Sequence, residues 1–472
     1  MGRSAGGGRA EKGQTMKKIW IGAAALALCC LAGAAGAEAA EGQGDALKIK
    51  NKEWKGETLF LRDGRVYGAP ETLARGGRWE ITREDGAYFV SVPVGDDGGR
   101  ETVRLPVGAD GLADLTFFGD QAGLKFKLNE KKKEIKFDKP KKPEKKKKDK
   151  KKDEKKKPIK NSGEVFIMWD PDMDFAPDRP FFDDEDQKRI VSPGWGTYAN
   201  ISAGKRYYPI AYIDQAQAAG VAVMPMINND FDPDATSAFL KDEGERTQFL
   251  RRLAAYTEVY GLDGWNIDFE NMDPKDAAAF TDFVADVADE MHERNKKISV
   301  DITAIGDPGS YWSGCYDRKG LAEHADWEIL MGYDQTAAAS PYAGPVSAYD
   351  WLDRVLPPLL EEIPADQLVL GLPFYTRVWT GDDGSVSSDV LTLLYTDEFT
   401  RKHKIVPRWQ KKERMFYADW RENGVRRRVW LEENRSLAEK LKLLGKYDLG
   451  GAAFWRYGFE TPAVYSALDE AL

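Results

Sequence analysis

Histidine and cysteine are both scarce in this chain. Its 472 residues hold three of each, namely His292, His324, His403, Cys29, Cys30 and Cys315. No histidine has the spacing to another histidine or to a cysteine that a zinc site requires. The sequence therefore indicates neither zinc chemistry nor a Ser-His-Asp triad, and we expect no metal and no cofactor.

Two of the cysteines lie in an apolar leader. Met16 and two lysines precede the run IWIGAAALALCCLAGAAGA, so a charged segment is followed by an apolar one that ends in small residues. This is the pattern of a secretory signal peptide. We assign it to residues 1–39, with Met16 as an alternative start and Ala-x-Ala cleavage after Ala37 or Ala39. We expect the protein to be secreted or held in the cell envelope.

Removal of that leader would leave Cys315 as the sole cysteine. A lipidated anchor is the disfavoured alternative, because Leu28 rather than a small residue precedes Cys29. With one cysteine no intrachain disulfide can form, so an exported fold must be stabilised by its core. We interpret Cys315 as a small buried hydrophobe.

One segment is almost without large apolar residues. Residues 139–160, KPKKPEKKKKDKKKDEKKKPIK, contain fourteen lysines against four acids, and the formal charge of the whole chain is −9. Such a composition cannot bury enough surface to fold, so we expect an extended Lys-rich linker between acidic parts. It is either a solvated spacer or a binding segment for anionic envelope polymers or membrane headgroups.

The segment before the linker, residues 46–138, contains a weak internal repeat. APETLARGGRWEITREDGAYFVSV and DLTFFGDQAGLKFKLNEKKKEIKF share the order short helix, glycine, strand, turn, strand, which predicts a small α+β domain. The first copy, with LFLRDGRVYGAPETLARGGRWE, resembles the copper-amine-oxidase-like N-terminal domains that bacteria attach to exported envelope proteins. The segment has no histidine or cysteine, so the resemblance does not imply copper.

Residues 163–472 alternate strand-like and helix-like stretches. Eight such units predict parallel strands joined by helices and closed into a (β/α)8 TIM barrel. A doubly wound sheet is disfavoured, because no Gly-rich phosphate turn is present. Residues 376–435 break the alternation, and two aromatic-rich runs around Glu422-Asn423-Gly424 predict a hairpin. We expect a small α+β insertion after the seventh strand that forms one wall of a cleft.

Polar residues occupy every second position of LDGWNIDFEN, residues 262–271. In a strand, Asn266, Asp268 and Glu270 share one face, and the apolar residues between them share the other. A half-exposed strand with its polar face in water would give the same alternation. In a barrel of parallel strands, however, catalytic groups lie at the C-terminal strand ends, so this polar face would point into the barrel mouth.

Four motifs, in this order, carry a family resemblance. DGWNIDFE is similar to the D-G-x-D-x-D-x-E pattern of glycoside hydrolase family 18, the chitinase-like barrels, except that Asn266 stands where those enzymes usually have the second Asp. MGYD at 331–334, GLPFY at 371–375 and FWRYG at 454–458 match strands six, seven and eight. SVDITA followed by WSGCYDRKGLAEHADW resembles the branch that acts on bacterial cell walls and spore cortex.

The resemblance implies a role for several residues of these motifs. Glu270 would be the general acid and base, kept protonated by burial beside Asp268. Asp268 would orient the substrate's 2-acetamido group, whose oxygen attacks the anomeric carbon in this family. Tyr333 would donate to that oxygen, Trp455 would form the floor of the central sugar site, and Asp334 would bind the sugar. The plainer alternatives are a core role for Trp455 and loop caps at Tyr333 and Asp334.

Further residues are assigned around the same motifs. Asp263 and Gly264 are expected to be structural and to hold the tight start of the strand. The expected substrate-binding residues also include Asn266, Met331, Asn228 and Trp195, with Asn229 and Trp312 as additional cleft candidates and a core role as the alternative for Met331.

Three functions fit the sequence. An exported β-N-acetylglucosaminidase acting on peptidoglycan, with chitin as the runner-up substrate, is favoured by the presence of Glu270. A non-catalytic carbohydrate-binding envelope protein would typically lack that acid, and a structural envelope protein would depend on the linker and the N-terminal domain. We expect an N-acetylated glycan as partner, no nucleic acid, and a monomer.

Overall fold

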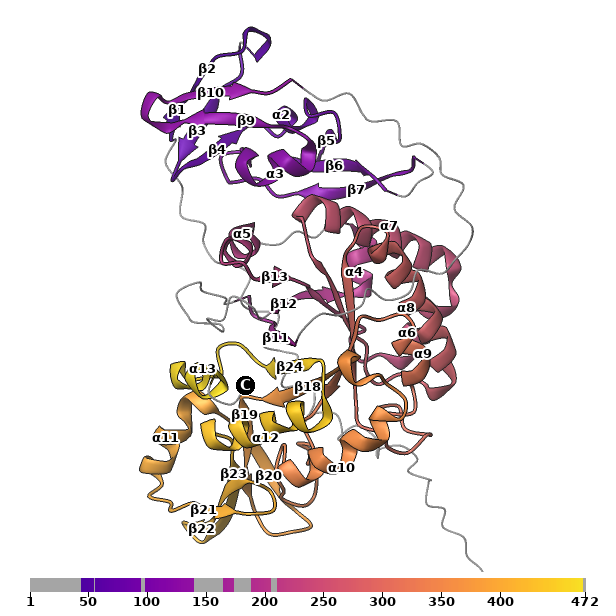
Figure 1. The fold of residues 1–472 in the computed structure, drawn as a ribbon, viewed down its shortest axis with the longest axis vertical. Coiled ribbons are helices and arrows are strands. Elements are labelled where there is room, and N and C mark those ends of the chain that lie inside the picture. Colours follow the sequence, from indigo (N-terminus) through magenta and orange to yellow (C-terminus); the bar gives the residue numbers. More distant parts are fainter. Residues whose placement is uncertain are drawn as a thin grey trace, which may run out of the picture.

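The computed structural model describes residues 44–54, 56–94, 98–139, 164–173, 188–204 and 210–469. An N-terminal domain and a barrel with an insertion follow each other along the long axis (Figure 1). The predicted leader and residues 140–160 of the Lys-rich linker lie outside the described residues. Among the described helices, none has the length and apolar character needed to cross a bilayer.

Eight parallel strands close into a barrel. In chain order they are β11 (Val165–Asp170), β12 (Lys188–Thr197), a third strand split into β13 (Ala222–Val223) and β14 (Met226–Asn228), β15 (Gly264–Asp268), β16 (Lys297–Ile302), β17 (Trp327–Met331), β18 (Leu368–Pro373) and β24 (Gly451–Trp455). Strand β11 pairs in parallel with both β12 and β24, which closes the barrel. The predicted (β/α)8 architecture is confirmed.

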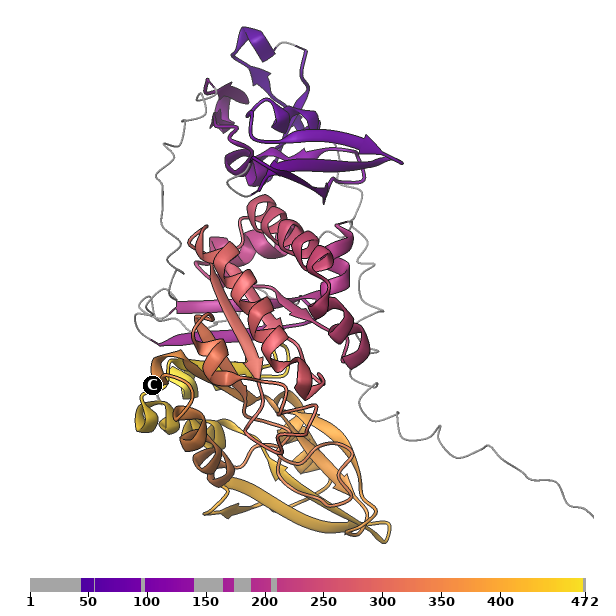
Figure 2. The ribbon, with the colours of Figure 1, turned by 90° about the vertical axis from the view of Figure 1, so that its right-hand side faces the viewer.

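Helices connect the strands and cover the outside of the barrel, as Figure 2 shows for several of them. They are α4 (Tyr198–Ala203), α5 (Ile210–Ala218), α6 (Pro233–Lys241), α7 (Glu243–Tyr260), α8 (Ala277–His292), α9 (Arg318–Ala322), α10 (Tyr349–Leu360), α12 (Asn434–Tyr447) and α13 (Pro462–Asp469). Asp242 ends α6 and caps α7, because its carboxylate accepts a hydrogen bond from the backbone N–H of Glu245 at 3.0 Å.

The strand side chains form two separate apolar regions. Trp265, Ile267 and Phe269 of the β15 segment belong to the main core between strands and helices, where Phe269 stacks on two phenylalanines of α8. A smaller cluster fills the barrel interior, and its members include Val165, Ile167, Trp169, Met226, Ile329 and Val369. The predicted alternation is therefore confirmed, with the apolar positions of residues 262–271 facing the helices.

The insertion follows the seventh strand, as predicted. It contains β19 (Tyr375–Thr380), β20 (Ser387–Thr392), α11 (Leu393–Lys402), β21 (Arg408–Gln410), β22 (Met415–Glu422) and β23 (Val425–Leu431), with strand order β20-β19-β23-β22-β21. The predicted hairpin is β22–β23, in which Glu422 pairs with Val425 across Asn423 and Gly424. Both turn residues have positive φ, as a two-residue hairpin loop of this kind requires.

The N-terminal domain has the predicted repeat. The first copy is α2 (Glu71–Ala74), β5 (Glu80–Glu84) and β6 (Ala87–Pro93), and the second is α3 (Leu115–Ala122), β9 (Phe126–Asn129) and β10 (Glu134–Phe137). In each copy the two strands form an antiparallel hairpin. The other strands are β1 (Asp45–Ala46), β2 (Lys48–Ile49), β3 (Leu59–Arg62), β4 (Arg65–Gly68), β7 (Arg100–Leu105) and β8 (Ala113–Asp114).

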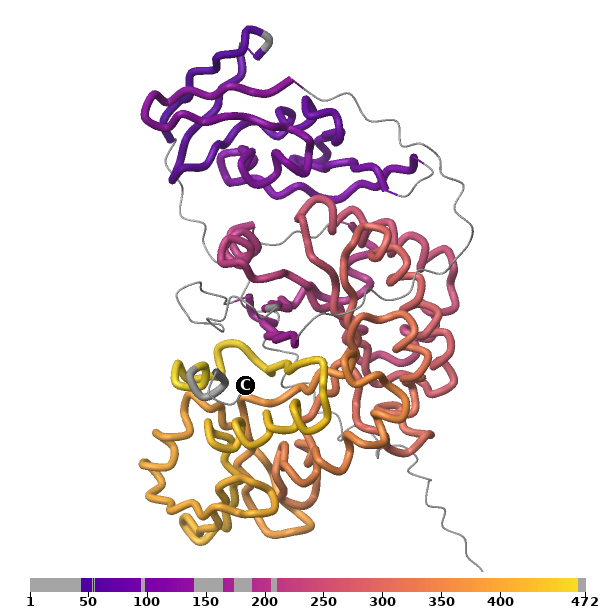
Figure 3. Tube along the Cα trace, viewed as in Figure 1, coloured from indigo at the N-terminus to yellow at the C-terminus, as the bar shows by residue number. Residues whose placement is uncertain are grey.

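The N-terminal domain packs on helix α7 of the barrel. Phe118 of α3 is fully buried, with its ring centroid 6.4 Å from that of Tyr260 at the end of α7. Arg252 in the middle of α7 pairs with Glu101 of β7, with 2.8 Å between Nη1 and Oε1. The insertion lies at the opposite end of the molecule (Figure 3), so the two additions do not share a face of the barrel.

Candidate active site

The start of β15 is fixed by two residues. A Cβ atom on Gly264 would lie 2.1 Å from the backbone oxygen of Lys297 on β16, so the close pairing of these strands requires glycine. The Asp263 carboxylate accepts a hydrogen bond from the backbone N–H of Val223 at 2.9 Å, which ties the start of β15 to the preceding strand. Both residues thus lie where a structural role was expected.

Asn266 is the centre of a buried hydrogen-bond network at the floor of the site. Its Oδ1 accepts from Trp169 Nε1 at 3.0 Å and from Ser192 Oγ at 3.4 Å. Its Nδ2 donates to Ser299 Oγ at 3.0 Å and to Asp301 Oδ1 at 2.9 Å. All four hydrogen-bonding positions of the amide are therefore used by the protein, and Asn266 organises the floor where a direct contact with substrate was expected.

Asp268 and Glu270 lie above Asn266 and form no ion pair within the described residues. Asp268 is 8% exposed, and its Oδ1 has no hydrogen-bond partner there. Burial raises the pKa of Asp268 to about 7. Burial also raises the pKa of Glu270 well above its usual value, and the negative charges of Asp268, Asp301 and Asp334 raise it further. Glu270 can therefore hold a proton at neutral pH, as a general acid must.

The backbone around Glu270 is held by two side chains. Asn229, which is 1% exposed, accepts a hydrogen bond from the Glu270 N–H at 3.0 Å and donates one to the Glu270 carbonyl oxygen at 2.7 Å. The Tyr316 hydroxyl donates to the Phe269 carbonyl oxygen at 2.9 Å. Asn229 was expected to line the cleft, and the structure instead places it as a clamp on the backbone of the acid.

Aromatic rings gather beside the acids. Tyr333 follows β17, and its ring centroid lies 6.3 Å from that of Trp169 and 6.5 Å from that of Trp455. Tyr333 and Trp455 are both partly exposed and pack on the cluster that fills the barrel interior. Burial raises the pKa of Tyr333 well above its usual value, so its hydroxyl stays a hydrogen-bond donor. The structure thus brings Tyr333 and Trp455 together at the mouth, with Trp169 beneath them.

Asp334 connects the site to the insertion. It has φ of 50°, and its Oδ1 accepts a hydrogen bond from the Tyr375 hydroxyl at 2.8 Å. Arg377 Nη2 lies 3.4 Å from the same oxygen. Tyr375 and Arg377 both belong to β19, so the first strand of the insertion positions the carboxylate. The Asp334 side chain remains 45% exposed and is open to a ligand.

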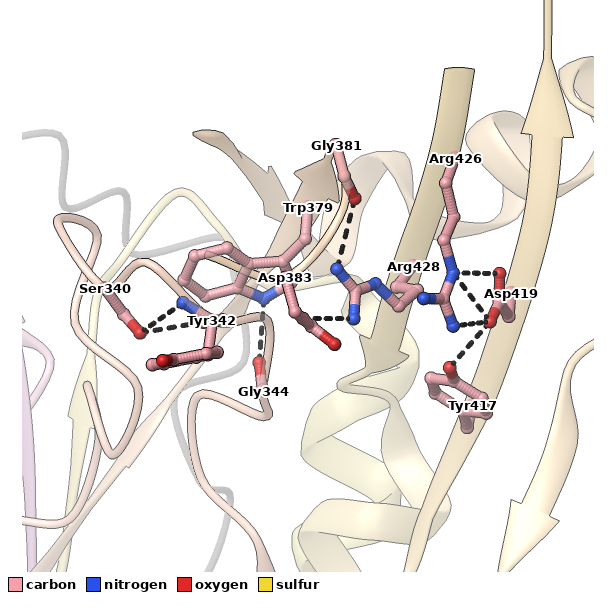
Figure 4. Close-up of polar contacts among 10 residues, drawn as sticks. All are labelled: Ser340, Tyr342, Gly344, Trp379, Gly381, Asp383, Tyr417, Asp419, Arg426 and Arg428. Carbon is pink, nitrogen blue, oxygen red and sulfur yellow. Dashed lines mark hydrogen bonds and ion pairs between the residues drawn. The ribbon is translucent and has the colours of Figure 1, made fainter. Parts of the chain in front are cut away.

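Polar contacts fix the insertion against the barrel (Figure 4). Trp379 Nε1 donates to the carbonyl oxygen of Gly344, in the loop after β17, at 2.7 Å. Arg428 of β23 pairs with Asp383 at 2.7 Å and donates to the carbonyl oxygen of Gly381 at 3.1 Å. The strand that carries Tyr375 and Arg377 is thus held between a barrel loop and its own sheet.

Asn228 and Met331 lie at the inner edge of their strands. Asn228 neighbours Asp268 in the register of β14 and β15, so the two share the inward face. Its Oδ1 accepts from the backbone N–H of Asp230 at 3.1 Å. Met331 ends β17 on the same face as Ile329 of the interior cluster. Asn228 and Met331 are both partly exposed, which leaves them accessible from the mouth.

Trp195 lies on the other side of the barrel wall. It is 1% exposed, and its ring packs against Tyr256 and Tyr260 of α7 and against the outward-facing Trp265, with centroids 5.3 to 5.9 Å away. The expectation that Trp195 binds substrate was therefore wrong. Strand β12 has a register irregularity between the two glycines that flank Trp195, and the indole there points to the helices.

Trp312 is exposed on the loop after β16. It is 45% exposed, and its ring centroid lies 6.2 Å from that of Phe231, a 37% exposed residue in the loop after β14 that the sequence did not reveal. Asn271, next to Glu270, donates from Nδ2 to the Phe231 carbonyl oxygen at 2.9 Å, so these aromatic residues flank the acid. Cys315 is fully buried, as expected, and burial raises its pKa to about 11.

Asp301 is the main residue of the site that the sequence interpretation missed. It is 1% exposed and lies on the inward face of β16. SVDITA contains a usable signal, because Ser299 and Asp301 alternate with apolar residues as the acids of β15 do. Trp169 offers no such signal, because β11 is buried on both faces and its sequence is apolar from Val165 to Trp169 without alternation.

A proton-holding glutamic acid at the C-terminal end of a (β/α)8 barrel, with a second buried acid two residues before it, is an arrangement suited to glycosidases. The chain belongs to such a family, because residues 127–460 match the model of glycosyl hydrolases family 18. The predicted family and enzyme class, a glycosidase, are thereby confirmed. The match begins inside the N-terminal domain, whose resemblance to copper-amine-oxidase-like domains stays a prediction.

Individual relatives are distant. The uncharacterized glycosylase YvbX of Bacillus subtilis is 26% identical over 244 residues, 51% of this chain and 70% of that protein. The cortical fragment-lytic enzyme of Bacillus anthracis is 24% identical over 52% of this chain, and the chain spans only 57% of that protein. The crystal structure of a chitinase from Chromobacterium violaceum has the same fold, with a TM-score of 0.58 and 21% identity over 66% of this chain and 99% of that one.

Proposed function

We propose that the protein is an exported glycoside hydrolase that cleaves β-1,4 linkages next to N-acetylglucosamine in cell-wall glycan, with peptidoglycan as its substrate. The observation that carries this proposal is the placement of two acids together at the C-terminal end of β15, with Asp268 as its last residue and Glu270 two residues beyond it. Glu270, whose pKa is raised by burial, would protonate the leaving glycosidic oxygen and then deprotonate the incoming water.

A substrate-assisted retaining mechanism is supported by the same placement. In an ordinary retaining glycosidase the acid and the nucleophile flank the scissile bond. Asp268 ends β15 and Glu270 follows two residues later at the same end of the barrel, so Asp268 is poorly placed to attack from the opposite side. The 2-acetamido oxygen would attack instead, with Asp268 accepting the acetamide N–H and stabilising the oxazolinium cation. Tyr333 would donate its hydroxyl to the acetamide oxygen.

Peptidoglycan is preferred to chitin as the substrate on two grounds. The stretch after β16 resembles the cell-wall branch of the family, and the relative from Bacillus anthracis is named for cortical fragments. The exposed rings of Phe231 and Trp312 would offer stacking surfaces to further sugars of either polymer. Chitin or chitooligosaccharides are the alternative, supported by the likeness in fold to a chitinase.

Export and attachment belong to the same proposal. The apolar leader of residues 1–39 supports export, and the fourteen lysines of the Lys-rich linker support binding to anionic envelope polymers. A spacer role for the linker is the alternative.

Digestion of purified peptidoglycan and of chitin oligomers, followed by mass spectrometry of the new reducing ends, tests the proposal. We expect new N-acetylglucosamine reducing ends from peptidoglycan. Release from chitin oligomers alone would favour the alternative substrate. Binding of either glycan without release would mean a non-catalytic carbohydrate-binding protein.

A further inference from the structure

Two neighbouring strands carry acids at matching positions of the barrel interior. In the register of β15 and β16, Asn266 lies beside Ser299 and Ile267 beside Val300. Continued by one residue, this register places Asp268, the last residue of β15, beside Asp301 of β16. Adjacent strands are about 4.8 Å apart and paired residues share a face, so these two carboxyl groups are neighbours inside the barrel.

The floor of the site holds the Asp301 carboxyl group, which receives hydrogen bonds from Asn266 and Trp169. Asn266 Nδ2 donates to Asp301 Oδ1 at 2.9 Å. The orientation of that amide is fixed, because Asn266 Oδ1 already accepts from Trp169 Nε1 and Ser192 Oγ. On the adjacent strand Asp268 Oδ1 is buried without a hydrogen-bond partner among the described residues. A carboxylate oxygen in that state needs a donor.

No cation compensates these acids in the described part of the site. The charges of Asp268 and Asp301 raise the pKa values of Glu270, Tyr316 and Tyr333. Asp334, which also raises that of Glu270, is paired with Arg377. Two buried carboxyl groups side by side cannot both ionise near neutral pH. Burial, followed by the charge of Asp268, raises the pKa of Asp301 well above its usual value, and these two causes outweigh the hydrogen bonds from Asn266 and Trp169, which lower it. Burial raises the pKa of Asp268 to about 7.

We infer that Asp301 is a positioning residue of the reaction, which in its neutral form donates a hydrogen bond to the Asp268 carboxylate and so allows Asp268 to carry the negative charge. The inference rests on the proposed function and gives a role to a residue outside the four motifs that match the barrel strands. The proton stays on Asp301 throughout, and Asp268 accepts the acetamide N–H of the substrate with its other oxygen. No bond to Asp301 is made or broken. Asn266, which is neutral, holds Asp301 in place and contributes no charge of its own.

Two substitutions at Asp301 separate this role from a structural one. Asp301→Asn keeps a donor with the shape of the neutral acid, so the acid limb of the kcat/KM profile should stay where the wild-type enzyme has it. Asp301→Ala removes the donor, so the acid limb of the kcat/KM profile should shift to higher pH by about one unit. At pH values below the limb, kcat/KM should then fall about tenfold. Ser299→Ala is the matched control, because it removes the other acceptor of Asn266 Nδ2 without removing an acid, and it should leave the limb in place.

The outcomes are distinct. If the acid limb of the kcat/KM profile does not shift in Asp301→Ala, Asp301 has only a structural role. If Asp301→Asn is as impaired as Asp301→Ala, Asp301 acts as an anion. Titration of ¹³C-labelled aspartate carboxyl groups in the wild-type protein tests the same point without turnover and without a variant. We expect Asp268 to ionise before Asp301, and the reverse order would overturn the inference. Failure of the proposed function would appear separately, as turnover retained in Glu270→Gln.

Discussion

Asn229 holds Glu270 by both groups of its peptide backbone, accepting from its N–H and donating to its carbonyl oxygen. The side-chain amide thus replaces a strand partner at the point where β15 has ended and the chain turns away. Because the clamp acts on the backbone, it fixes the height of the acid above the barrel floor and leaves the carboxyl group free to exchange its proton.

We expect Asn229→Ala to lower kcat by about tenfold to a hundredfold with a smaller change in KM, because the acid loses its position while the rest of the site persists. Two hydrogen bonds to buried backbone groups are lost, so unfolding should become easier by about 1–3 kcal/mol. Steady-state kinetics and denaturant unfolding measure the two effects. Thr236→Val is the control, because it removes the other acceptor of Asn229 Nδ2, at 2.9 Å, and leaves both bonds to the Glu270 backbone. An equal fall in kcat there would argue against the clamp.

Glu270→Gln should abolish hydrolysis and spare glycan binding, because it keeps the shape of the side chain and removes the proton donor. Turnover on peptidoglycan and isothermal titration with a glycan oligomer measure the two properties. A variant that retains most of its turnover would show that another group is the acid.

The same substitution should also change the pH dependence of stability. Folding raises the pKa values of Glu270 and Asp268, so their contribution to stability is complete below the unfolded value of about 4 and is lost as the pH rises through the folded values, about 7 for Asp268. The wild-type Tm should therefore fall as the pH rises from about 4 to about 7, and Glu270→Gln should make that fall less steep. Thermal unfolding followed across pH is the measurement.

Asp268→Asn should lose most of its rate by failing to stabilise the oxazolinium cation, with a smaller effect on ground-state binding. If the acetamide is the nucleophile, cleavage retains the anomeric configuration, fails on a de-N-acetylated central sugar and is inhibited by thiazoline mimics. Proton NMR of the first product decides the point. An α-anomer from a β-linked substrate would mean inversion by an activated water.

Asn266→Asp should leave activity within about tenfold and mainly shift its pH dependence. The new carboxyl group would face Asp301 Oδ1, which now accepts a hydrogen bond from the Asn266 amide at 2.9 Å. The titration of the new acid would then be coupled to those of Asp268 and Asp301. The profile of kcat/KM against pH records the shift. A loss much greater than tenfold with an unchanged profile would mean that the substitution disrupts the floor of the site.

Deletion of residues 139–160 should release the protein from anionic envelope polymers, and high ionic strength should do the same to the intact protein, because screening weakens the attraction of its lysines. Co-sedimentation with cell walls at low and high salt is the test. Attachment unchanged in both cases would leave the linker a spacer.

The period-2 pattern of LDGWNIDFEN was sufficient to place Asp268 and Glu270, because a strand in a closed barrel has one inward face and one helix-facing side. The same rule applied to SVDITA would have found Asp301. It could not have placed Trp195, which lies at an irregular point of β12. Nor could it have placed Asn229, whose role depends on contact with a backbone 41 residues further along the chain. Contacts of that kind are set by tertiary packing, which local periodicity does not encode.

The packing of the N-terminal domain on α7 means that the Lys-rich linker does not determine the spacing of the two domains. In the sequence the linker lies between β10 of that domain and β11 of the barrel. The N-terminal domain and the barrel are in direct contact, through Phe118 with Tyr260 and through Glu101 with Arg252. When two domains are in contact, the length of the segment that connects them does not set the distance between them. The distance between the N-terminal domain and the acids at the barrel mouth is therefore set by these contacts, whatever the length of the chain between β10 and β11.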